Sequence, residues 1–138
     1  MGELTVVIPV RDDVRVGRGL ASFDEARAHP LVVMNDPTQE VRELVEGTGC
    51  DSLTLPAAGG PAACEAGMQS ARTAAVLFMD SDCVFYPGTL TSFVDAVGTA
   101  DFVRGVTIFR HHTRLQRVVA RSRVRHTNMP KMLFKVPL

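Results

Sequence analysis

Short apolar runs alternate with amphipathic segments along this chain, and this alternation leaves few folds open to it. Apolar runs buried on both faces are typical of parallel strands, and the amphipathic segments between them are typical of helices. The predicted strands are 4–10, 31–35, 51–55, 74–80 and 101–109, and the predicted helices are 17–29, 38–46, 61–72 and 89–97. A strand–helix series of this kind predicts an α/β domain with a mainly parallel sheet flanked by helices.

Local residues mark where two of the predicted helices begin and end. Thr38 is a candidate N-cap, and Gly47 is the expected end of the same helix. Pro61 is expected in the first turn of the next helix, after Gly59 and Gly60. Helix N-termini attract phosphates, but this stretch lacks both the Walker pattern and GxGxxG, which favours an ordinary helix entry.

Composition excludes several classes of protein. With 138 residues, 46% hydrophobic and 22% charged, the chain is expected to form one globular domain rather than a disordered segment. No apolar run approaches the ~18 residues of a membrane-spanning helix, and the first residues lack the basic region of a signal peptide. The three cysteines lack CxxC spacing, which argues against a zinc site or a disulfide framework and favours a cytoplasmic location.

Charge is distributed unevenly although the net charge is zero. Residues 1–101 hold all 15 acidic residues and 6 of the 15 Lys and Arg, so they carry −9, whereas residues 102–138 carry +9. The segment 109–126 is predicted to form a basic amphipathic helix. It would pack against a further part of the protein or contact an anionic lipid or a lipid-phosphate acceptor. No nucleic-acid partner is expected, because the segment lacks interleaved aromatic residues and a known motif.

Three polar clusters follow predicted strands: "RDD" at 11–13, "NDP" at 35–37 and "DSD" at 80–82. Ligands of open parallel sheets bind outside the carboxyl ends of the strands, so three clusters at such ends predict a site. Asp80 and Asp82 would repel each other unless a cation joined them, and two carboxylates suit Mg²⁺ or Mn²⁺. The alternative interpretation of "DSD" is a solvated turn.

The other two clusters allow two interpretations each. Asp36 is either an Asx turn or helix N-cap, or a hydrogen-bonding partner of a nucleotide base or ribose. Arg11 and Asp12 are either surface charges or ligand contacts. Cys64 and Cys83 are expected to be small residues of the core or near the site rather than nucleophiles.

The motifs together resemble a known family. "TVVIPVRDD", "LVVMNDPTQE" and "GGPAACEAGMQSARTAAVLFMDSDCVFYPGTL" resemble the N-terminal, nucleotide-sugar-binding half of family 2 glycosyltransferases, which have the GT-A fold. The resemblance covers residue 4 to about residue 92 and implies a nucleotide-diphosphate sugar donor with Mn²⁺ or Mg²⁺ on its diphosphate. It implies that Pro9 and Arg11 line the base pocket and that Asp36 contacts the base or ribose. Asp80 would contact the ribose or the metal-bound diphosphate, and Asp82, together with Asp80, would hold the metal.

Two departures from the family pattern leave the donor undetermined. Asn35-Asp36 stands where the family often has Asp-Asp, and Cys64-Glu65 stands where it often has Arg-Asn. Inverting enzymes of the family use a later carboxylate as base, and no acidic residue follows Asp101. The base is therefore expected beyond residue 138, in a chain truncated after its donor-binding half. Residues 1–110 would be the donor-binding region and 111–138 the start of the acceptor side, with an acceptor that is lipid-linked or anionic and a location peripheral to the membrane.

Two alternatives to this transferase remain. The chain could bind a nucleotide without turnover on its own. "VLFMDSDCV" also resembles the motif of haloacid-dehalogenase-type phosphatases, in which the first Asp is a nucleophile and the second a general acid. That class is less favoured, because three strand–helix units precede the motif here and no acidic residue follows Asp101.

Overall fold

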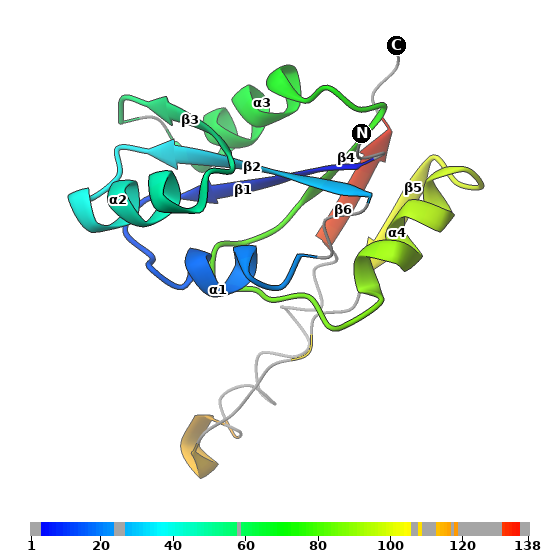
Figure 1. Ribbon diagram of the computed structural model, residues 1–138. Helices are drawn as coiled ribbons and strands as arrows, with labels where there is room; N and C mark the ends of the chain where they lie inside the picture. Colours follow the sequence, from blue (N-terminus) through cyan, green and yellow to red (C-terminus); the bar gives the residue numbers. More distant parts are fainter. Residues whose placement is uncertain are drawn as a thin grey trace.

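The computed structural model describes residues 4–23, 27–57, 59–105, 108, 113–116, 118 and 131–135. Its elements are β1 (Leu4–Val10), α1 (Val16–Leu20), β2 (Ala28–Asn35), α2 (Gln39–Thr48), β3 (Asp51–Leu55), α3 (Gly60–Ser70), β4 (Ala75–Phe78), α4 (Thr89–Val97), β5 (Phe102–Gly105) and β6 (Lys131–Lys135). The strands form one sheet in the order β3-β2-β1-β4-β6-β5 (Figure 1). Strand β1 runs parallel to β2 and β4, and β2 runs parallel to β3, whereas β6 is antiparallel to β4 and β5. The predicted α/β fold with a mainly parallel sheet is confirmed.

Helices cover the sheet on both faces, and β1 lies at its centre. Val6 and Ile8 belong to the larger core, to which α1, α2 and α4 contribute their apolar side chains. Val7 points to the other face, where Ala63 of α3 completes a smaller core. All three β1 side chains are fully buried. Burial on both faces explains why this strand is a continuous apolar run rather than an alternating one.

Several predicted boundaries hold, and others shift for identifiable reasons. Thr38 caps α2 as predicted, because its Oγ1 accepts a hydrogen bond from the Val41 N–H at 3.4 Å. Helix α2 runs past Gly47 and ends at Gly49, whose φ of 70° is the left-handed conformation typical of a helix end. The predicted helix 17–29 is wrong in length, since only Val16–Leu20 is helical and β2 already begins at Ala28. Ala28 and His29, which the local pattern predicted to be helical, instead pair with β1 as the first residues of β2.

Strand β6 is an element that the sequence pattern did not indicate. It lies between β4 and β5, with Phe134 opposite Val76 on one side and Phe102 on the other. Both partners are far away along the chain, so no local periodicity predicts this pairing. The predicted basic helix 109–126 lies mostly outside the described residues. Its described members Leu115 and Val118 are exposed.

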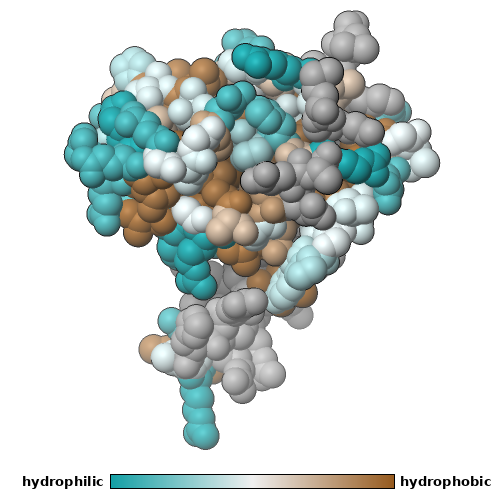
Figure 2. All heavy atoms as spheres, viewed as in Figure 1, coloured by the Kyte–Doolittle hydropathy of each residue, from teal (hydrophilic) through white to brown (hydrophobic). Residues whose placement is uncertain are grey.

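The surface mixes polar and apolar side chains. Figure 2 shows hydrophilic residues over α2 and hydrophobic residues toward the middle of the same face. Large apolar side chains that are exposed include Val84, Tyr86 and Phe102. Among the described residues, no helix is both long and apolar enough to cross a membrane.

Candidate functional site

Parallel pairing brings the carboxyl ends of β1, β2 and β4 to one edge of the sheet. The chain proceeds from β1 outward to β2 and β3, and β4 then lies on the opposite side of β1. Open α/β sheets bind their ligands at the carboxyl edge, beside such a reversal of strand order. We name this edge, formed by the ends of β1, β2 and β4, the switch-point crevice. The pairing of β1 with β4 stops near Val7, whose carbonyl accepts the Met79 N–H at 3.0 Å. Pro9 lies just beyond this point and stays paired only with β2, opposite Val33.

An ion pair joins the first two polar clusters. Arg11 Nη2 lies 3.3 Å from Asp36 Oδ2, and both side chains are more than half exposed. The loops that carry them are also joined through the backbone, because the Thr38 N–H donates to the Arg11 carbonyl at 3.2 Å. Asp36 has a φ of 50°, a left-handed conformation that Asp tolerates better than most residues. Since Thr38 caps α2, the helix-cap alternative for Asp36 is wrong.

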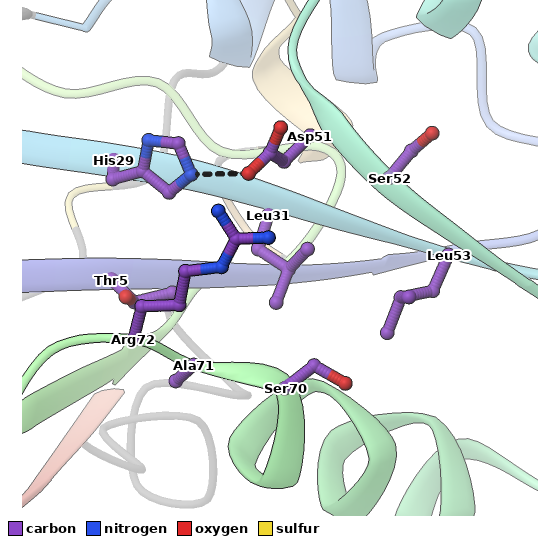
Figure 3. A pocket seen from close by; sticks show the side chains of 9 residues that line it. All are labelled: Thr5, His29, Leu31, Asp51, Ser52, Leu53, Ser70, Ala71 and Arg72. Atoms are coloured by element: carbon purple, nitrogen blue, oxygen red, sulfur yellow. Dashed lines mark hydrogen bonds and ion pairs between the residues drawn. The ribbon is translucent and has the colours of Figure 1, made fainter.

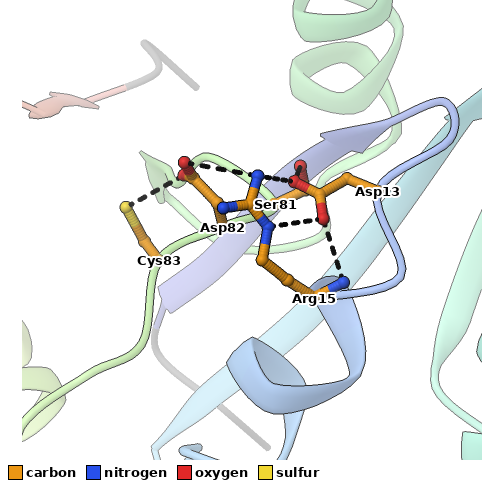
Figure 4. Close-up of polar contacts among 5 residues, drawn as sticks. All are labelled: Asp13, Arg15, Ser81, Asp82 and Cys83. Carbon is orange, nitrogen blue, oxygen red and sulfur yellow. Dashed lines mark hydrogen bonds and ion pairs between the residues drawn. The ribbon is translucent and has the colours of Figure 1, made fainter. Parts of the chain in front are cut away.

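A second group of contacts joins the first cluster to "DSD" (Figure 4). Arg15 donates from Nε and Nη2 to the two carboxylate oxygens of Asp13, each at 2.8 Å. The Arg15 backbone N–H and the Ser81 hydroxyl also donate to this carboxylate, at 3.0 and 3.4 Å. On its other side, Arg15 Nη2 lies 3.9 Å from Asp82 Oδ2. The three predicted clusters therefore meet at one edge through direct contacts.

Electrostatics keep the Asp13–Arg15 pair charged. The hydrogen bond from Arg15 lowers the pKa of Asp13, against the smaller opposing effect of burial. The same hydrogen bond raises the pKa of Arg15 above its ordinary value. Neither residue was among the sequence-predicted site residues. The sequence indicated Asp13 only as a member of "RDD". No local pattern indicates that its carboxylate binds Arg15, or that Arg15 also approaches Asp82 at the end of a distant strand.

The "DSD" segment supplies the candidate metal ligands. One ligand atom from each of Asp80, Asp82 and Cys83 lies within 4.8 Å of the others. The two carboxylates fit a hard divalent cation, which prefers oxygen ligands. The Cys83 thiol fits such a cation poorly, because sulfur is a soft ligand that suits other metals. Asp80 and Asp82 are therefore the pair that fits a divalent cation.

Helix α1 and the turn after it hold the segment that follows "DSD". A Cβ at Gly19 would lie 2.8 Å from the Cys83 carbonyl oxygen, so α1 approaches the segment more closely than a side chain would allow. The Phe85 N–H donates to Ser22 Oγ at 2.9 Å. The rings of Phe23 and Phe85 meet edge to face, 5.3 Å apart. A hollow of about 320 Å³ lies over these residues.

A second hollow, of about 190 Å³, lies at the amino ends of the strands. His29 Nε2 lies 2.8 Å from Asp51 Oδ2 in its wall, and Arg72 extends toward this pair from beyond the end of α3 (Figure 3). Leu31 and Leu53 form its apolar side. None of the sequence-predicted site residues lines this hollow, so the opposite edge with "DSD" is the candidate site.

The raised pKa of Cys83 predicts slow alkylation at neutral pH, because the thiolate is the reactive form. With EDTA present, we expect the iodoacetamide rate at Cys83, measured by peptide mass spectrometry, to rise about tenfold per pH unit up to about pH 10. Asp82→Asn should increase the rate at pH 8 modestly, because burial contributes more to the shift than the carboxylate does. A rate that levels off below pH 9 would contradict this expectation.

Residues 6–135 match the family model of glycosyl transferase family 2. The chain belongs to this family. The match covers the strands of the crevice and all the clusters described above, and it favours the glycosyltransferase interpretation over the phosphatase alternative. None of the curated proteins matches the chain.

Solved glycosyltransferases share the fold of this family 2 domain. Residues 1–349 of S. aureus TarS match with a TM-score of 0.72 at 19% sequence identity, and the match covers 98% of this chain and 47% of that portion of TarS. Glucosyl-3-phosphoglycerate synthase from Mycobacterium tuberculosis was solved with Mn²⁺, uridine-diphosphate and phosphoglyceric acid. It matches with a TM-score of 0.67 at 15% identity, over 97% of this chain and 56% of that one. Mannosyltransferase PcManGT from Pyrobaculum calidifontis was solved with GDP-Man and Mn²⁺. It matches with a TM-score of 0.62 at 15% identity, over 78% of this chain and 36% of that one. The chain thus spans about half of these structures or less.

Proposed function

We propose that this family 2 domain binds a nucleotide-diphosphate sugar with a divalent cation and takes part in inverting transfer of the sugar. The observation that carries this proposal is the meeting of three polar clusters at the switch-point crevice. Arg11 pairs with Asp36 there, and Asp80 and Asp82 lie at the end of the neighbouring strand β4. Membership of glycosyl transferase family 2 supports sugar transfer as the reaction in which this crevice takes part.

The nucleoside would bind between the ends of β1 and β2. We assign Pro9 and Arg11 to the base pocket and Asp36 to the base or ribose. Because Arg11 and Asp36 are both exposed, their ion pair is worth less than about 1 kcal/mol, so a nucleoside can separate them at little cost.

The diphosphate would bind at the end of β4. Asp82 and Asp80 would hold Mn²⁺ or Mg²⁺, and Asp80 would also contact the ribose or the metal-bound diphosphate. The cation would neutralise the charge of the leaving nucleoside diphosphate. Two of the solved relatives contain Mn²⁺ together with a nucleotide or nucleotide sugar, which supports a divalent cation in this family.

Four further parts of the proposal concern features outside this crevice. The catalytic base beyond residue 138 stays a prediction, and so does a lipid-linked or anionic acceptor. The cytoplasmic location, peripheral to a membrane, likewise stays a prediction. The division into a donor region at 1–110 and an acceptor-side region at 111–138 is part of the same proposal.

Calorimetric titration of UDP and of GDP, each with Mn²⁺ and with EDTA, tests the proposal. We expect one of the two nucleotides to bind, and only with Mn²⁺. Absence of binding under every condition would contradict the donor site. Sugars linked to the nucleotide that binds are then incubated with the chain. Release of free sugar would indicate a transferase domain, and its absence would indicate a domain that binds the nucleotide without turnover.

A further inference from the structure

We propose that Arg15 is a second cationic contact for the donor diphosphate, held in position by Asp13 beside the pair Asp80 and Asp82. This inference rests on the proposed function, which it extends by a residue outside the predicted metal motif. It assigns Asp13 the role of a positioning residue, which acts through Arg15.

The first observation is that the guanidinium group is already oriented. A guanidinium carries five N–H donors in one plane, and Asp13 takes one from Nε and one from Nη2. Asp13 itself accepts hydrogen bonds from the Arg15 backbone and from Ser81, so the carboxylate cannot turn freely. These two hydrogen bonds to Asp13 therefore fix the plane of the guanidinium group and leave three of its N–H donors for another group. A charge-assisted contact made from a fixed plane loses little side-chain entropy on binding.

The second observation is where the remaining donors lie. The Arg15 side chain is 61% exposed, whereas the Asp13 side chain is 20% exposed. The guanidinium group of this ion pair is therefore the part that solvent or a ligand can reach. Its Nη2 lies 3.9 Å from Asp82 Oδ2 (Figure 4). The free donors of Arg15 therefore lie beside the carboxylate that would hold the cation, on the side where a phosphate oxygen of the donor would bind.

The third observation is the charge of this edge. Asp13, Asp80 and Asp82 place three carboxylates beside a crevice that would receive a diphosphate anion. Arg15 neutralises Asp13 and presents positive charge toward Asp82. A distance of 3.9 Å is too long for a hydrogen bond, so Arg15 leaves Asp82 Oδ2 available to a cation, whereas the Cys83 thiol donates to Asp82 Oδ1 at 3.7 Å. Arg15 thus complements the cation rather than replacing it.

The test compares Arg15→Gln with the wild-type chain and with Arg18→Gln, a change of an exposed arginine in α1, the helix that Arg15 precedes. Three titrations are made by calorimetry: Mn²⁺ alone, inorganic pyrophosphate with Mn²⁺, and UDP or GDP with Mn²⁺. For Arg15→Gln we expect pyrophosphate and the nucleotide to bind at least about tenfold more weakly, as for the loss of one charge-assisted hydrogen bond. Mn²⁺ alone should bind within about twofold of wild type. Arg18→Gln should match wild type in all three titrations, and Arg15→Lys should recover part of the loss.

Other outcomes overturn the inference in distinguishable ways. If Arg15→Gln binds pyrophosphate and nucleotide as wild type does, Arg15 is not a phosphate contact although the donor site stands. Tighter binding of Mn²⁺ by Arg15→Gln, with unchanged nucleotide affinity, would show that Arg15 competes with the cation. If the wild-type chain binds neither nucleotide under any condition, the proposed function fails and this inference fails with it. Thermal melting of each variant shows whether a loss of binding reflects unfolding.

Discussion

Asp82→Ala is expected to weaken metal-dependent nucleotide binding by at least about a hundredfold. Loss of a residue that merely supports a metal ligand costs 10–100-fold in affinity, so loss of a ligand itself should reach or exceed the upper limit. Calorimetry with Mn²⁺ and the nucleotide that the wild-type chain binds measures the effect. Because the Asp82 side chain is 48% exposed, the substitution should leave the melting temperature nearly unchanged.

Asp51→Ala is the matched control for this experiment. Asp51 is also an exposed carboxylate, but it contacts His29 at the amino end of the strands, away from the crevice. We expect nucleotide affinity within about twofold of wild type. Metal-dependent binding that survives in Asp82→Ala would remove Asp82 from the metal site, and equal losses in both variants would indicate a general structural effect.

Gly67→Ala is expected to destabilise the domain by about 1–3 kcal/mol, the usual cost of overpacking a core. Helix α3 crosses β1 and β2 at Gly67, and a Cβ there would overlap Val7 Cγ1 and lie 3.1 Å from Val33 Cγ2. Both valines are fully buried in the smaller core, so neither can move aside without disturbing its neighbours. Urea denaturation followed by circular dichroism measures the change in the free energy of unfolding.

Gly47→Ala provides the contrast within the same chain. Gly47 lies inside α2, and a Cβ there would meet nothing within 4 Å. Alanine in a helix interior is more favourable than glycine by roughly 0.5–1 kcal/mol, so this variant should be more stable than wild type. Similar changes in stability for Gly67→Ala and Gly47→Ala would contradict the close packing of α3 on the sheet.

Local sequence was sufficient for those features whose cause is local. The apolar run 4–10 predicted a strand buried on both faces, and Thr38 predicted a cap, because burial pattern and capping act within a few residues. The ends of α1 and α2 were predicted poorly. Register pairing with β1 decided that β2 already begins at Ala28, and the left-handed turn at Gly49 rather than Gly47 decided the end of α2.

For the site, the strand pattern was enough to predict that "RDD", "NDP" and "DSD" end strands of a parallel sheet and therefore share one edge. Which side chains meet at that edge depends on how the strands are ordered in the folded domain. Asp13 contacts Ser81, 68 residues away along the chain, and Arg15 reaches Asp82 because β1 and β4 are neighbours across the switch point. Strand β6 likewise depends on partners distant in sequence. Periodicity reports which face of an element is buried, whereas contacts between elements depend on strand order and side-chain direction, which no local pattern encodes.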